Sequence, residues 1–247
     1  MFEGNIAAGK STLVSRLAAD EPERYVCAPE AIGASFLAAF YKQPQRYGFA
    51  LQMTQQAHRA ALLDAALAST SPTRTMLLDR SILGDYAFAL WNAAIGNLDA
   101  EQWALYQEQA GSSIAACLQR CPPDEVSIVF LYDTASECQA RQAERDSTAV
   151  DAAYMLGLES AHFVVLACVP TTYKLIELQW SEYANQAAAP TVFDALLDGD
   201  GDDDDDDDDV EEPPRARLAV RARSSISQHV FNADARAFLL DALTSLC

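Results

Sequence analysis

The residues from Gly4 to Thr12 could bind the phosphates of a nucleotide. Gly4 to Ser11 reads GNIAAGKS and matches the pattern GxxxxGK[ST], with Thr12 next. Such a loop wraps its backbone N–H groups around phosphates at the N-terminus of the following helix. Lys10 would reach the terminal phosphates, and the Ser11 hydroxyl would complete the coordination shell of Mg²⁺. We therefore expect a phosphate-binding loop (P-loop) for ATP and Mg²⁺, formed by the following residues: Gly4, Asn5, Ile6, Ala7, Ala8, Gly9, Lys10, Ser11 and Thr12.

Two groups of charged residues follow predicted strands. Glu30 comes soon after a strand at 24–28, and Asp79 and Arg80 come directly after a strand at 75–78. The carboxyl ends of strands form the edge where α/β sheets bind ligands. Glu30 could take a proton from a substrate hydroxyl there, whereas alone it would be a surface glutamate. Asp79 could hold Mg²⁺ or water and Arg80 a transferring phosphate; a structural ion pair is the alternative.

Two arginines one helical turn apart could form a lid. Arg141 and Arg145 lie on a predicted helix at 135–145, so their side chains share one face. Such a pair could clamp phosphates as a mobile lid. The alternative is a solvated helix face that also carries Glu137 and Glu144.

Short apolar strands alternate with helices along the chain. This alternation, opened by a P-loop, predicts an α/β protein: a P-loop NTPase-type three-layer fold with a five-stranded parallel sheet flanked by helices. Only three residues precede the loop, so either the first strand is very short or the chain has lost its beginning. The expected strands are 24–28, 75–78 and 127–132, and the expected helices are 44–68, 84–95, 99–119, 135–145 and 151–167.

The composition describes a protein without a membrane span. The chain has 247 residues, of which 50% are hydrophobic, and it could form one α/β domain or at most two small ones. No apolar stretch approaches the roughly 18 residues of a membrane span. A formal net charge of −19 argues against a nucleic-acid or anionic membrane surface as partner. We expect an intracellular protein, cytoplasmic by default, or mitochondrial or plastid if the N-terminus is incomplete.

Most of the excess acid lies in one tract. Residues 198–212 hold twelve of the 36 acidic residues, and without them the net charge is −7. Eight consecutive aspartates repel one another and bury no apolar surface, so we expect a disordered insertion at 186–224 with an arginine-rich end. The predicted P-loop core then covers 1–185, and 225–247 supplies a strand and a helix that complete it.

The P-loop sequence resembles that of the deoxynucleoside kinases. The shared Asn-Ile-Ala pattern opens a similarity that covers most of 3–166, and Pro29-Glu30-Ala31-Ile32 is similar to the family's Pro-Glu-Pro-Val. The resemblance implies transfer of the γ-phosphate of ATP to the 5′-hydroxyl of a deoxynucleoside, with Glu30 as the base and Arg80 and Lys10 as further catalytic residues. It also implies a homodimer through the helices at 44–68 and 84–119.

The same resemblance implies a nucleoside site. The stretch from Tyr41 to Gln52 matches a family segment with identical spacing, in which Tyr41 would bind the sugar 3′-hydroxyl and Gln52 the base. Arg59 and Asp85 match an arginine and an aspartate that contact the base in members that accept deoxycytidine or deoxyguanosine. An Arg–Asp pair would crowd out the thymine methyl, which favours deoxycytidine or a purine over thymidine.

The sequence departs from the family pattern in the lid. Ser147 stands where a third arginine is usual, and no glutamate matches the lid acid, for which Asp146 and Asp151 are the available substitutes. The last strand has two candidates, 173–180 and 228–232. We favour the second, because the family normally ends with a strand and then a helix.

Two other functions remain open. A nucleoside-monophosphate kinase, such as a thymidylate kinase, also has a P-loop and an Asp-Arg pair, but a base beside an anionic acceptor would repel it. An accessory subunit of respiratory complex I resembles this family without being catalytic, and the depleted lid and the long insertion would fit it.

Overall fold

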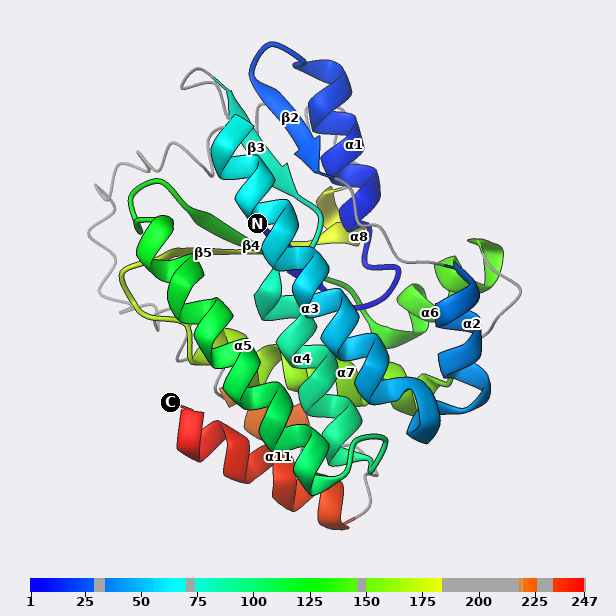
Figure 1. Cartoon of the computed structure of the whole chain (residues 1–247). Coiled ribbons are helices and arrows are strands. Elements are labelled where there is room, and N and C mark those ends of the chain that lie inside the picture. The colour runs from blue at the N-terminus through cyan, green and yellow to red at the C-terminus, as the bar shows by residue number, and fades with distance from the viewer. Residues whose placement is uncertain are drawn as a thin grey trace, which may run out of the picture.

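Five short parallel strands form the centre of the fold (Figure 1). β4 pairs with β1 on one side and β5 on the other, and β2 pairs with β3. A single bridge between Phe2 and Asp79 joins the two groups, so the order is β2-β3-β1-β4-β5. The strands are β1 (Phe2–Gly4), β2 (Tyr25–Ala28), β3 (Thr75–Leu78), β4 (Ser127–Tyr132) and β5 (Lys174–Gln179).

The expected five-stranded parallel sheet is thus confirmed with one difference, because only three strands form its main ladder. β1 begins where β3 ends, since Phe2 faces Asp79, the first residue after β3. The two strands are staggered end to end, and one bridge is all that their overlap allows. Of the two candidates for the last strand, 173–180 forms β5.

The structure, a computed structural model, describes residues 1–28, 34–69, 74–145, 150–183, 218, 220–225 and 233–246. Glu30, the segment 228–232 and nearly all of the expected insertion lie outside these residues. Within that expected insertion, Leu218 and Ala222 are helical and buried in the main core, and the division at 186–224 stays a prediction.

Helices cover both faces of the sheet, as expected for a three-layer fold. Ile128 and Phe130 of β4 point into a core formed with α4, α5, α7 and α11, whereas Val129 and Leu131 face a second core that contains α1. The four middle residues of β4 are apolar and buried, as expected for a strand covered on both faces. The helices are α1 (Lys10–Asp20), α2 (Ala34–Lys42), α3 (Pro44–Ser69), α4 (Ile82–Ala94), α5 (Ala100–Arg120), α6 (Ala135–Arg145), α7 (Ala152–Ala167), α8 (Trp180–Tyr183) and α11 (Ala233–Leu246).

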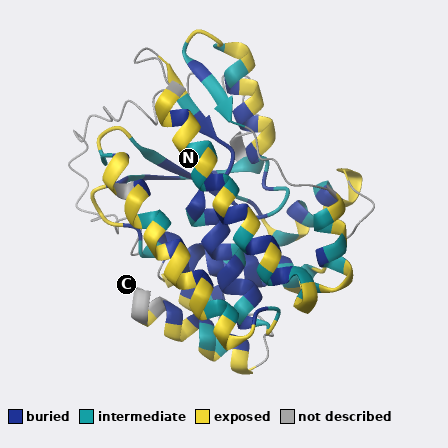
Figure 2. Cartoon of the chain, viewed as in Figure 1, coloured by how far each residue is buried: buried dark blue, intermediate teal, exposed yellow. Residues whose placement is uncertain are grey.

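α4 is the central helix of the larger core (Figure 2). It contacts α3, α5, α7 and α11, and most of its residues are buried. Ser81 caps its N-terminus by accepting a hydrogen bond from the Leu83 N–H. Because Ser81 directly follows Arg80, the start of this buried helix fixes the chain at a predicted site residue.

Among the described helices, none is long and apolar enough to cross a membrane.

Candidate active site

A cavity of about 460 Å³ lies at the carboxyl ends of the strands. It gathers P-loop residues, Tyr41 of α2, Arg80 after β3, and both lid arginines of α6, as the sequence predicted. Its lining residues are Ile6, Ala7, Gly9, Lys10, Ser11, Thr12, Leu37, Tyr41, Arg80, Phe88, Arg141, Glu144, Arg145 and Trp180.

The P-loop has backbone angles that explain its glycines. Gly4 and Gly9 have φ values of 140° and 99°, which side-chain-bearing residues rarely adopt. A Cβ atom at Gly4 would also lie 1.9 Å from the Leu131 carbonyl oxygen. The loop also contacts α7, because the side-chain amide of Asn5 donates to the Met155 carbonyl at 2.9 Å. The loop therefore keeps its shape through packing and through contacts with β4 and α7.

Three cations converge on the carbonyl oxygens of this loop. Lys10 Nζ donates to the carbonyls of Gly4 and Asn5 at 3.1 and 2.6 Å. The Arg80 guanidinium donates to the Gly4 carbonyl at 2.8 Å, and Arg141 Nε to the Ala7 carbonyl at 2.9 Å. A phosphate is a stronger, charged acceptor for the same donors. The arrangement can therefore offset negative charge that develops on a transferred phosphoryl group.

Asp133 fixes the position of the Arg141 side chain. Its guanidinium forms an ion pair with Asp133 at 2.9 Å, and the Asp133 side chain is fully buried. Arg145 lines the cavity from the last turn of α6. Asp151 caps α7 by accepting a hydrogen bond from the Ala153 N–H, so this acid serves a helix end. Asp146 and Ser147 lie outside the described residues.

The donor set fits a magnesium ion. Ser11 lines the cavity, whereas Asp79 does not. Asp79 Oδ1 is nevertheless buried without a hydrogen-bond partner in the part of the chain that the structure describes. Mg²⁺ takes oxygen ligands, and usually keeps several waters and phosphate oxygens beside one or two protein ligands. One hydroxyl and one carboxylate are therefore enough. The described residues contain no group of three or more His, Cys, Asp or Glu side chains that could hold a metal ion.

The predicted Arg59–Asp85 pair is present. Arg59 Nε lies 3.4 Å from both carboxylate oxygens of Asp85, and both residues are buried. The Arg59 guanidinium also donates to the Asp79 carbonyl at 3.0 Å, next to Arg80. Gln52 is buried on α3. None of these three residues lines the 460 Å³ cavity. Arg59 lines a smaller cavity of about 170 Å³, which it shares with Arg80.

Four cavity residues were missed by sequence reasoning: Leu37, Phe88, Glu144 and Trp180. Arg80 lies over the Phe88 ring, 4.8 Å from its centroid, and a Cβ at Gly9 would meet the Trp180 ring at 2.5 Å. Trp180 directly follows β5, as Asp79 follows β3, so the rule about carboxyl ends of strands could have found it. Phe88 follows Asp85 by one helical turn, which was also a usable signal.

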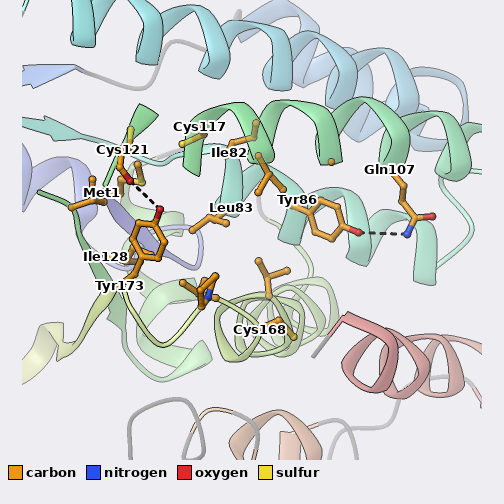
Figure 3. A pocket seen from close by; sticks show the side chains of 16 residues that line it. Met1, Ile82, Leu83, Tyr86, Gln107, Cys117, Cys121, Ile128, Cys168 and Tyr173 are labelled. Atoms are coloured by element: carbon orange, nitrogen blue, oxygen red, sulfur yellow. Dashed lines mark hydrogen bonds between the residues drawn. The ribbon is translucent and has the colours of Figure 1, made fainter. Parts of the chain in front are cut away.

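Another cavity, of about 480 Å³, lies at the opposite end of the sheet. Figure 3 shows the side chains that line it. Met1 and Tyr173, which precede β1 and β5, line it, and the Tyr173 hydroxyl donates to the Cys121 carbonyl at 2.9 Å. Burial raises the pKa of Cys117 to about 12, so this thiol stays protonated. The lining is mostly apolar and contains no lysine or arginine, so we assign the chemistry to the 460 Å³ cavity.

A parallel sheet with a GxxxxGK[ST] loop between its first strand and first helix defines the P-loop class of phosphate-binding proteins. Within this class, residues 1–198 match the family model of the deoxynucleoside kinases. The chain therefore belongs to the deoxynucleoside kinase family, whose members are ATP-dependent kinases.

Individual relatives agree with this family. Deoxycytidine kinase 2 of Gallus gallus is 26% identical over 196 residues, which cover 65% of this chain and 71% of the relative. Deoxyguanosine kinase of Dictyostelium discoideum is 27% identical over 191 residues, which cover 75% and 65% respectively. Deoxyadenosine kinase from M. mycoides, solved with bound dCTP, shares the fold with a TM-score of 0.64 at 15% identity, over 80% of this chain and 97% of that one.

Proposed function

We propose that this protein transfers the γ-phosphate of ATP to the 5′-hydroxyl of a deoxynucleoside and thereby salvages nucleosides. The observation that carries the proposal is the convergence of Lys10, Arg80 and Arg141 on the P-loop, in a member of the deoxynucleoside kinase family. Phosphoryl transfer depends mainly on positioning and on charge stabilisation, which are what these three cations provide.

Each residue then has a defined task. Lys10, Arg80 and the lid pair Arg141 and Arg145 offset charge on the phosphoryl group as it moves from donor to acceptor. Tyr41 holds the sugar through its 3′-hydroxyl. Ser11 and Asp79 would hold Mg²⁺, which would neutralise part of the charge on the phosphates. Glu30 accepts the proton of the attacking 5′-hydroxyl, a role inferred from its place after a strand and from the family resemblance.

The preferred base is a second part of the proposal. Arg59 and Asp85 form a buried pair, and Gln52 offers a donor and an acceptor in one amide. Such groups suit the amino and oxo edges of cytosine or a purine, and they crowd the methyl group of thymine. We therefore favour deoxycytidine or a purine deoxynucleoside over thymidine.

We also expect a homodimer, as the family resemblance implies. α4 is enclosed by α3, α5, α7 and α11, so it has little free surface for a partner. Leu67 on α3 and Leu105 on α5 are exposed, at 39% and 55%. Of the helices expected to form the dimer, α3 and α5 therefore offer the better surface.

Replacement of Glu30 by glutamine tests the proposed base. The amide cannot accept the proton, so Glu30→Gln should lower kcat by about 10²- to 10⁴-fold while ATP affinity stays unchanged. The measurement is steady-state transfer from ATP to deoxycytidine, with ATP affinity from calorimetry. Glu23→Gln, at an exposed position before β2, is the matched control and should behave as wild type. Near-normal turnover of Glu30→Gln would remove this residue as the base.

A further inference from the structure

Arg80 adopts a backbone conformation that side-chain-bearing residues avoid. Its φ is +68°, in the left-handed region, which costs roughly 1–2 kcal/mol for a residue other than glycine. From this conformation the guanidinium donates to the Gly4 carbonyl at 2.8 Å and lines the 460 Å³ cavity. Strain of this kind persists only where the surroundings impose it.

Strand β1 holds the chain on both sides of Arg80. The Arg80 N–H donates to the Phe2 carbonyl at 3.0 Å. On the other side, Glu3 Oε1 accepts hydrogen bonds from the Ser81 N–H at 2.7 Å and from the Ser81 hydroxyl at 2.5 Å. The peptide units before and after Arg80 are therefore both fixed by neighbouring residues of one strand.

Burial of the Glu3 carboxyl group costs free energy. Its residue is completely buried, Oε2 has no hydrogen-bond partner among the described residues, and burial raises its pKa. The helix that follows Ser81 leaves space for it at Gly84. A Cβ atom there would lie 2.2 Å from Glu3 Oε2, so any larger residue would push the carboxyl group away from Ser81.

We propose that Glu3 is a positioning residue that holds Arg80 in its left-handed conformation and so aims the guanidinium at the transferred phosphate. The claim about Arg80 and phosphate rests on the proposed kinase function, whereas the claim about its backbone does not. Glu3 acts through Ser81 and touches neither nucleotide nor acceptor. Its oxygen matters as a hydrogen-bond acceptor, so a side chain that keeps an oxygen at this place should replace it in part.

Three variants test this role. Glu3→Leu removes the acceptor and should lower kcat about 10²-fold, with the KM for ATP little changed, because a small misplacement of a catalytic group is enough for such a loss. Glu3→Gln keeps a neutral acceptor and should stay within about tenfold of wild type, because hydrogen bonds to a charged acceptor are only about twice as strong. Gly84→Ala leaves Glu3 in the chain but displaces its carboxyl group, and should resemble Glu3→Leu.

Glu177→Leu is the matched control. This variant removes another largely buried carboxylate from a strand, and that carboxylate pairs with Arg221 instead of supporting the site. It should lower the melting temperature without lowering kcat. If Glu3→Leu does not fold, Gly84→Ala decides. Equal kcat losses in Glu3→Leu and Glu3→Gln, or a wild-type kcat in Gly84→Ala, would overturn the proposal.

A crystal structure of Glu3→Leu, or of Gly84→Ala if the first does not fold, separates this inference from the proposed function. The φ of Arg80 should leave the positive range, and its guanidinium should leave the Gly4 carbonyl. An unchanged Arg80 would contradict the positioning role even in an active kinase. If the wild type transfers no phosphate to any deoxynucleoside, the proposed function fails, and this structural result still decides what Glu3 does.

Discussion

At the residue scale, an imidazole lies in the core behind the site. His162 packs edge-on to Phe88, with ring centroids 5.9 Å apart, and stacks on Phe130 at 6.2 Å. Phe88 in turn lies under the Arg80 guanidinium. Burial, together with the positive charge of Arg80, lowers the pKa of His162 to about 3. The ring is therefore neutral at physiological pH, and Nδ1 lies 2.8 Å from the Leu158 carbonyl oxygen.

This lowered pKa makes stability depend on pH. Between pH 6.5 and about 3, the unfolded chain binds a proton at His162 and the folded chain does not, so the free energy of unfolding falls as pH falls. In His162→Phe this contribution disappears. The free energy of unfolding should then fall less steeply with falling pH, by up to about 1.4 kcal/mol per pH unit. Urea titrations from pH 7 to 4 measure it. Parallel curves for variant and wild type would contradict the buried neutral imidazole.

The site residues that sequence predicted are those carried by local motifs. Lys10 and Ser11 follow from one contiguous pattern, and Arg80 from its place after a strand. Phe88 and Trp180 were missed because their membership depends on how α4 and β5 pack against the P-loop. The Arg59–Asp85 contact was expected from the family resemblance, and the structure shows the contact, whereas its role in base selection stays a prediction.

At the element scale, periodicity was sufficient for most helices and strands. Residues 75–78 and 127–132 form strands as predicted, and α6 covers 135–145 as expected. α2, which is only nine residues long and mostly apolar, was not predicted. Residues 174–179 form the strand beside β4, a non-local pairing that chain order does not predict. The favoured segment 228–232 lies outside the described residues and stays a prediction.

Two helix-interior glycines should respond to alanine in opposite ways. Gly111 on α5 is exposed, and a Cβ there would meet no atom within 4 Å, so Gly111→Ala should raise the free energy of unfolding by about 0.5–1 kcal/mol. A Cβ at Gly157 on α7 would lie 2.0 Å from the Trp91 ring. Gly157→Ala should therefore lower the free energy of unfolding by about 1–3 kcal/mol. Denaturant unfolding of the two variants measures both changes. A stabilising Gly157→Ala would show that α4 and α7 pack more loosely than described.

At the scale of the whole molecule, net charge and local charge point in opposite directions. The chain carries −19, of which twelve negative charges come from 198–212. The cavity at the carboxyl ends of the strands nevertheless contains Lys10, Arg80 and the two lid arginines. An acidic protein can therefore bind a small polyanion such as ATP, because the attraction is set by the groups within a few ångströms of the phosphates.

The most direct test of the account is transfer of the labelled γ-phosphate of ATP. Wild-type protein is incubated with each of the four deoxynucleosides and, separately, with the four corresponding monophosphates, and Lys10→Ala serves as the control. We predict label on deoxynucleosides, with deoxycytidine or a purine ahead of thymidine, and loss of transfer in Lys10→Ala. Transfer only to monophosphates, or no transfer to any acceptor, would contradict the central claim.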